Sequence, residues 1–349
     1  MQQANGNDRN SVEILPGDGK EWLELAARDA KDETPHEFLL MEGNLGIPQK
    51  ILYRAYLEAA PAFKQALNVL SESSVTPSGF IDSSHAAALA ESTAVLLVLN
   101  PGHQSAWNSR KRLVECGYID LTRELSLTTA LLTVRECAKH SILWHHRRWL
   151  LRRLYLPHTI LSHAQDEIIT DEDSLQSLDI STSRFRAEFD ACMLAATTYE
   201  RNYFAWTHRT RCLDALTSLL HNTATRTQEL LELLHEEKIN VTLWIDRHVA
   251  DYTAMQYHCR LASLALALNP PPSLTSTATY EHAKSLVEAY PEHESLWYYL
   301  RGSVWAEGIS APEGCSWVES ISQAKPEADS STEVGLRHAQ RCLNWLARQ

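Results

Sequence analysis

A tryptophan followed three residues later by an arginine recurs in this chain, each time where a helix is expected to begin. An apolar-periodic helix leads up to each of these points, a short polar break follows, and a second periodic helix starts at the tryptophan. The repeating unit is therefore a pair of helices. One such unit cannot bury its own apolar face, so neighbouring copies must stack to build a continuous core. The three clear copies are anchored at Trp107 and Arg110, Trp144 and Arg147, and Trp206 and Arg209.

Two further copies depart from this pattern. Met255 stands where the fourth tryptophan belongs, and His258 replaces the arginine. Trp297 restores the aromatic anchor in the fifth copy, but Arg301 comes one place later than expected. Five stacked helix pairs predict an all-α fold, a right-handed superhelical solenoid of the tetratricopeptide type that bends into a crescent.

The periodic segments also predict how the chain is organised. We expect a single solenoid domain over residues 20–349, because a solenoid of this length need not split into separate domains. An acidic insertion between the second and third copies is expected to be a mobile loop. The expected parts are a disordered lead at 1–19, an N-terminal cap at 20–83, five repeats at 84–306, a C-terminal loop and capping helix at 307–349, and the insertion itself at 155–183.

Charge and composition exclude some classes of protein. The chain has 349 residues and a net charge of −12, which disfavours nucleic acid as the main partner. It has no apolar run long enough to span a membrane, and its first residues are polar rather than signal-like, so we expect a cytoplasmic protein. The seven cysteines are scattered and form no Cys-x-x-Cys pair, which is typical of reduced thiols within helices.

The amino-acid sequences of the repeats resemble those of a known family. Lys-x-x-x-x-Trp-His-His-Arg-Arg-Trp-Leu at 139–150, Arg-Asn-Tyr-x-Ala-Trp-x-x-Arg at 201–209 and His-Glu-Ser-x-Trp-x-Tyr-Leu-Arg-Gly at 293–302 are similar to the repeats of protein prenyltransferase alpha subunits. The segments 248–257 and 290–297 most resemble the branch called protein prenyltransferase alpha-subunit repeat-containing protein. The resemblance covers about 84–306.

The resemblance implies a partner chain. In this family the alpha subunit wraps around a beta subunit, an α-α barrel that carries the zinc and the isoprenoid pocket. The branch implies a beta subunit of the Rab geranylgeranyltransferase type. Neither a metal nor a cofactor is therefore expected in this chain, and zinc and isoprenoid diphosphate are expected in the partner.

The sequence also indicates a partner-binding chain without any reference to the family resemblance. A crescent of helix pairs presents a long surface on which a partner can be held. The sequence contains no nucleophile elbow, no phosphate-binding glycine loop and no His-Glu-x-x-His zinc helix, so it shows no catalytic chemistry of its own. Two functions remain open. One is a non-catalytic alpha subunit of a protein geranylgeranyltransferase, and the other is a helical repeat scaffold for protein–protein interaction without transferase activity.

The family resemblance also implies a diphosphate-facing site. Lys139 matches the position at which family members direct a lysine towards the isoprenoid diphosphate, and Asn202 and Tyr203 match an Asn-Tyr pair facing the same site. Phe204 replaces the histidine that follows in the family, and Ser141 stands where farnesyltransferase has a tyrosine. The alternative is structural: a solvated surface lysine, with Asn202 and Tyr203 serving in helix capping and core packing.

Other conspicuous residues are interpreted as structural. The three histidines of the second repeat are not expected to bind a metal, because neighbouring helical positions point about 100° apart and no further ligand completes the set. The tryptophans and arginines of the repeats are expected to hold helices together, and two polar residues before their anchors are expected to be N-caps. The histidines are His140, His145 and His146, and the expected N-caps are Asn202 and Asp251.

Overall fold

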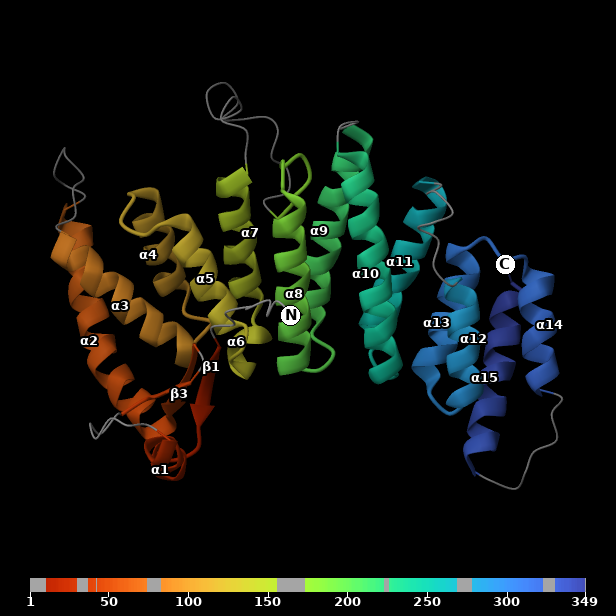
Figure 1. Cartoon of the computed structure of the whole chain (residues 1–349), viewed down its shortest axis with the longest axis horizontal. Helices are drawn as coiled ribbons and strands as arrows, with labels where there is room; N and C mark the ends of the chain where they lie inside the picture. Colours follow the sequence, from red (N-terminus) through yellow and green to blue (C-terminus); the bar gives the residue numbers. More distant parts are fainter. Residues whose placement is uncertain are drawn as a thin grey trace. The chain divides into compact units, whose positions relative to one another are not determined.

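The computed structural model of the chain is mainly α-helical (Figure 1), which confirms the predicted fold class. The residues that it describes cluster into two compact units. The single domain predicted over 20–349 stays a prediction. The described residues are 11–29, 37–41, 43–73, 83–155, 173–222, 226–268, 278–322 and 330–348.

Unit 1 contains residues up to Asp179 together with Asp190–Arg211. Its core is built where helix pairs meet, and fully buried side chains such as Leu97, Trp107 and Trp144 form one apolar cluster there. Its elements are β1 (Val12–Leu15), α1 (Lys20–Asp29), β2 (Leu39–Met41), β3 (Asn44–Pro48), α2 (Gln49–Ser73), α3 (Ser83–Leu99), α4 (Gln104–Glu115), α5 (Leu121–Leu131), α6 (Arg135–Ala138) and α7 (Ser141–Tyr155), with the later part of α8 (Thr182–Thr198) and the first part of α9 (Tyr203–Asn222).

Unit 2 contains Ile180–Phe189 and the residues from Cys212 onwards. Here α10 packs against α11, α11 against α13 and α12 against α13, and the last two helices pack against each other. Besides the remaining parts of α8 and α9, its elements are α10 (Thr227–Arg247), α11 (Tyr252–Leu268), α12 (Thr279–Ala289), α13 (Glu294–Ala306), α14 (Ala311–Ser322) and α15 (Ser330–Leu346).

All five repeat anchors occupy the same place in their helices. Each is the fourth residue of the second helix in its pair, and each is at least 96% buried. A large side chain at this position lies over the turn that precedes the helix, so it can pack against the residues just before the helix begins. The anchors are Trp107 in α4, Trp144 in α7, Trp206 in α9, Met255 in α11 and Trp297 in α13.

The N-terminal segment corrects the expectation of a disordered lead over 1–19. Residues 1–10 lie outside the described part, but β1 pairs in parallel with β3, and β2 pairs antiparallel with β3, giving the order β1-β3-β2. Val12 and Ile14 pack against the core cluster of unit 1, and the Thr133 hydroxyl accepts a hydrogen bond from the Val12 amide (2.7 Å). Burial of two apolar side chains and a satisfied backbone amide hold this segment in place.

Two other expectations also need correction. Residues 156–172 of the acidic insertion lie outside the described part, but 173–181 is anchored, because Leu175, Leu178 and Ile180 are buried and Asp173 accepts hydrogen bonds from Arg148 (3.1 and 3.0 Å). The expected C-terminal loop contains α14, whose Val318 is buried. The final helix is α15, and its role as a cap stays a prediction.

None of the described helices has the length and apolar character needed to cross a membrane.

Candidate functional site

The tryptophan anchors make a repeated hydrogen bond to the turn before their helix. The indole nitrogen of Trp107 donates to the carbonyl of Pro101 (2.8 Å), Trp144 donates to Ala138 (3.0 Å), and Trp297 donates to Pro291 (2.8 Å). In each case the acceptor lies six residues earlier. The indole thus fills the space between helices and also satisfies a carbonyl that the helix break would leave unpaired.

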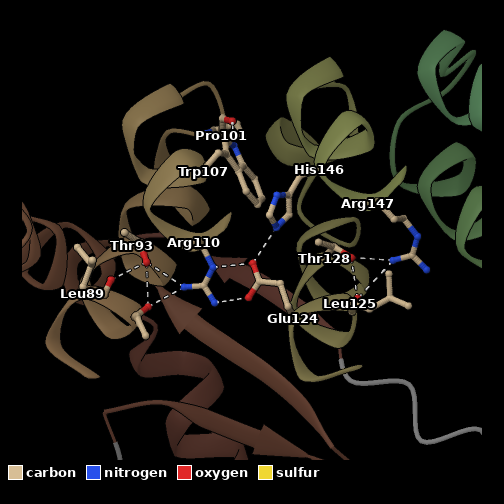
Figure 2. A network of polar contacts seen from close by, with 11 residues as sticks. Leu89, Thr93, Pro101, Trp107, Arg110, Glu124, Leu125, Thr128, His146 and Arg147 are labelled. Carbon is tan, nitrogen blue, oxygen red and sulfur yellow. Dashed lines mark hydrogen bonds and ion pairs between the residues drawn. The ribbon is translucent and has the colours of Figure 1, made fainter. Parts of the chain in front are cut away.

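The arginines that follow two of the anchors bind the first helix of a pair. Arg110 donates through Nε and Nη2 to the two carboxylate oxygens of Glu124 (2.8 and 2.6 Å), and through Nη1 to the carbonyl of Ala90 (2.7 Å) and the hydroxyl of Thr93 (2.9 Å) (Figure 2). Arg147 makes the equivalent contacts one repeat later, where Nη1 donates to the hydroxyls of Thr128 (2.8 Å) and Thr129 (2.9 Å) and to the carbonyl of Leu125 (3.4 Å).

Glu124 is the buried carboxylate at the centre of this network. Burial alone would raise its pKa, but hydrogen bonds and charge from His146 and Arg110 outweigh burial and bring the pKa to about 2. Since Glu124 is ionised, Nε2 of His146 donates to it (2.9 Å). Burial lowers the pKa of His146, so the ring is neutral and packs against Trp107, with 4.6 Å between ring centroids. The sequence did not single out Glu124, because nothing local marks it as the partner of Arg110.

In the fourth repeat the imidazole of His258 takes the place of the arginine guanidinium and makes polar contacts to two other helices. Nε2 of His258 lies 3.1 Å from the hydroxyl of Thr242 on α10, and Nδ1 lies 2.5 Å from the hydroxyl of Tyr299 on α13. Burial, with the charges of His282 and Lys238, lowers the pKa of His258 to about 3. His258 is therefore neutral near pH 7 and bridges its neighbours without a buried charge.

The three residues of the predicted diphosphate-facing site come together in unit 1. Nδ2 of Asn202 donates to the carbonyl of Ala138 (2.8 Å), while its Oδ1 accepts a hydrogen bond from the amide of Ala205 (3.1 Å) and so caps α9. This contact joins residues 64 positions apart in the chain. Because Lys139 follows Ala138 and Tyr203 follows Asn202, the break before α7 and the start of α9 form one edge.

Lys139 and Tyr203 differ in their surroundings. The Lys139 side chain is 38% exposed, and its ammonium lies 2.7 Å from the carboxylate of Glu136 and 5.8 Å from the centroid of the Tyr199 ring. Tyr203 is 62% exposed and contacts the ring of Phe204 edge-on. The expectation that Tyr203 packs in the core is therefore wrong, because at the first position of α9 its side chain points to solvent.

The structure adds an arginine to this edge that sequence analysis missed. Arg135 lies one helical turn before Lys139, and its guanidinium is 5.2 Å from the centroid of the same Tyr199 ring. Spacing of four residues within a helix could have suggested that the two cations share a face. Two exposed or half-exposed cations beside the Tyr199 ring form a surface that can bind an anion.

The described part of the chain contains no group of three or more histidine, cysteine, aspartate or glutamate side chains that could hold a metal ion. The histidines near the second anchor make other contacts. His146 binds Glu124, and Nδ1 of His145 lies 2.8 Å from the Asp173 carboxylate. These side chains thus belong to helix–helix and helix–loop contacts.

Comparison with a family model agrees with these repeats. The protein prenyltransferase alpha subunit repeat matches residues 121–154 and 185–216. The first match covers the pair α5 and α7 with the anchor Trp144, and the second covers most of α8 and α9 with the anchor Trp206.

Three relatives carry the name of this repeat. Protein prenyltransferase alpha subunit repeat-containing protein 1 of Danio rerio is 31% identical over 243 residues, covering 61% of this chain and 54% of the relative. The protein of the same name from Homo sapiens is 25% identical over 249 residues, covering 61% and 58%. Repeat-containing protein 1-A of Xenopus laevis is 31% identical over 169 residues, covering 48% and 35%.

The chain thus spans about half the length, or less, of these relatives. Its repeats match the family model at two places, and the relatives are named for the same repeat. The resemblance to the protein prenyltransferase alpha subunit repeat family predicted from the sequence is confirmed, and the chain carries at least two of that family's repeats.

Proposed function

We propose that this chain is the alpha-type subunit of a heterodimeric protein geranylgeranyltransferase in the cytoplasm. Its partner would be a beta subunit of the Rab geranylgeranyltransferase type, which holds the zinc ion and the isoprenoid diphosphate. The observation that carries the proposal is the pair of cations Arg135 and Lys139 beside the Tyr199 ring, which lies within repeats of the prenyltransferase alpha type. Helical repeats commonly hold such partners on one extended surface.

The chemistry of the transfer explains why cations are needed at that edge. A thioether bond forms between a cysteine sulfur of the substrate protein and an isoprenoid carbon, while the bond from that carbon to the diphosphate oxygen breaks. Negative charge therefore builds on the departing diphosphate. The ammonium of Lys139 and the guanidinium of Arg135 would stabilise that charge in a site shielded from water. Glu136, which pairs with Lys139 in the isolated chain, would have to release it.

A second candidate function is a repeat scaffold that binds proteins without supporting transfer. Phe204 stands where the family has a histidine, and Glu136 already neutralises Lys139. Both features reduce what this chain can contribute to diphosphate binding. In that case the extended repeat surface would be used for protein binding alone.

Co-expression distinguishes the two functions. The chain is produced together with candidate prenyltransferase beta subunits, and the purified product is tested for a one-to-one complex that transfers labelled geranylgeranyl to protein. We expect both a complex and transfer. A complex without transfer would favour the scaffold, and failure to form any complex would rule out the enzyme subunit.

Substitution of Lys139 tests its role in the complex. Lys139→Ala should reduce the transfer rate roughly tenfold or more while leaving assembly intact, since one charge contact to the leaving group is lost. Lys50→Ala is the matched control, because Lys50 is 70% exposed and lies at the start of α2. Equal loss of assembly and transfer in the Lys139 variant would show that Lys139 is only an interface residue.

A further inference from the structure

The last helix of unit 2 lies beside α13 in a parallel register. A side chain added at Gly335 of α15 would meet Pro291 at 2.9 Å, Arg341 pairs with Glu294 (3.1 Å), and the Arg301 guanidinium lies 5.9 Å from the Trp345 ring centroid. Contacts thus advance along both helices in the same direction. Both helices can be followed in Figure 1, where they carry the bluest colours with α12 and α14.

Two large aromatic side chains stand exposed on this part of the molecule. Tyr298 is 57% exposed and Trp305 is 75% exposed, and their spacing of seven residues puts them on one face of α13. Arg301 lies between them on the same face, with its guanidinium 5.1 Å from the Tyr298 ring centroid. Aromatic rings flank this guanidinium on two sides, while its buried Nε has no hydrogen-bond partner among the described residues.

Positive charge predominates along the seam between the two helices. Arg337 and Arg341 are exposed one turn apart on α15, and Arg301 lies on the neighbouring helix α13. Burial lowers the pKa of His338, and the charges of these arginines lower it further although Glu294 opposes them. Of the charged groups that shift the pKa of His338, three are these arginines and one is Glu294, which pairs with Arg341. Glu333 near the start of α15 and Glu292 just before α13 are also exposed. The surplus is opposite in sign to the chain's net charge of −12.

We propose that this surface binds an acidic segment of a partner protein that also carries apolar side chains. We define the α13–α15 face by Tyr298, Arg301, Trp305, Arg337, Arg341 and Trp345. Tyrosine, tryptophan and arginine are the residue types that contribute most to protein interfaces. The arginine forks match carboxylates in geometry and charge, and the exposed rings offer apolar surface for neighbouring side chains.

Charge complementarity favours an acidic protein segment over other partners for the α13–α15 face. A chain with a net charge of −12 repels acidic peptides in general, so an acidic segment would bind where the local charge is positive. Nucleic acid also carries negative charge, but the whole chain repels a long polyanion, and Trp305 and Tyr298 favour apolar side chains. The proposal concerns unit 2 and does not depend on the transferase function proposed for Lys139 in unit 1.

The test uses the full chain and a fluorescent peptide in which glutamate alternates with leucine. A peptide of alternating glutamine and leucine is the ligand control. Arg337→Gln/Arg341→Gln should weaken binding of the glutamate peptide by roughly tenfold or more, because two charge-assisted contacts are lost. Arg54→Gln/Arg153→Gln makes the same change in net charge at exposed positions outside the face and should leave binding unchanged.

Trp305→Ala provides a second test that leaves every charge in place. This substitution should weaken binding of the glutamate–leucine peptide several-fold. It should not affect folding, since Trp305 is 75% exposed. Three results would overturn the proposal: no binding of the glutamate peptide, equal binding by the two double variants, or binding of a single-stranded oligonucleotide in place of the peptide. Circular dichroism of each variant checks that the helices remain folded.

Discussion

At the scale of single residues, Glu124 shows why the repeat needs a buried charge. Its carboxylate accepts two hydrogen bonds from Arg110 and one from His146, and all three residues are at most 5% exposed. Glu124→Gln would leave the Arg110 charge buried without its counter-charge. We expect a loss of about 3 kcal/mol in the free energy of unfolding at pH 7, measured by denaturant titration.

The effect of this substitution should depend on pH. The pKa of Glu124 is about 2 in the folded chain against an ordinary value of 4.5, so its stabilisation is complete above 4.5 and is lost as the pH falls towards 2. The difference between the original chain and Glu124→Gln should therefore shrink over that interval. Glu115→Gln is the control, because its pair with Arg153 is exposed and should contribute less than about 1 kcal/mol. A constant difference at all pH values would contradict the role given to Glu124.

At the scale of helices, Asn202 joins two elements with one side chain. Its Oδ1 caps α9 and its Nδ2 binds the carbonyl of Ala138, which also accepts the indole N–H of Trp144. Asn202→Asp keeps the cap but places a carboxylate against that carbonyl. We expect it to cost about 1–2 kcal/mol in the free energy of unfolding, even though an acidic residue at a helix N-terminus is otherwise favourable.

Asn202→Ala removes both contacts and should cost more than Asn202→Asp. Asp251 offers a comparison, because it caps α11 (3.3 Å to the amide of Ala254) and its other oxygen accepts from the indole of Trp244 (3.1 Å). Each carboxylate oxygen of Asp251 accepts a hydrogen bond, so Asp251→Asn would place an amide NH2 group against one of the two donors and should also destabilise the chain. If Asn202→Asp proved as stable as the original chain, the link to Ala138 would not contribute to stability.

At the scale of the whole molecule, each unit should lose stability in acid through a buried histidine, and unit 1 should lose more below pH 4.5. His258 in unit 2 has its pKa lowered from 6.5 to about 3, so the unfolded chain binds this proton first and stability falls as the pH drops below 6.5. Burial also lowers the pKa of His146 in unit 1, so that unit likewise loses stability below pH 6.5, and Glu124 adds its own loss below 4.5. We expect hydrogen exchange in α10, α11 and α13 to accelerate at mildly acidic pH, and exchange in α4, α5 and α7 to accelerate further once the pH falls below 4.5.

His258→Gln removes the titrating group and should flatten the stability of unit 2 between pH 6.5 and 4.5. Denaturant unfolding across this range, followed by hydrogen exchange of single helices, measures the change. An unchanged slope in the variant would show that His258 is not the group responsible.

Much of the architecture could be predicted because it depends on local pattern. Apolar residues at helical spacing and polar breaks are enough to define the helix pairs. The anchors Trp107, Trp144 and Trp297 each lie six residues after the carbonyl that the indole binds. Asn202 and Asp251 were predictable as N-caps for the same reason, since a cap contacts an amide three residues away.

The remaining features depend on contacts between distant residues, which no local pattern records. The β1-β3 pairing joins segments about thirty residues apart in the chain, and Arg110 finds Glu124 across a helix boundary. Tyr203 and Asn202 are adjacent in sequence, yet one is exposed and the other buried, because only packing determines which side chain of a helix start faces a neighbour. The sequence by itself determined the helix pairs, since their hydrogen bonds and periodicity are local. Tertiary structure alone decided the buried charge partners, the cation edge at Lys139 and the α13–α15 face, because these arise only when separate helices come into contact.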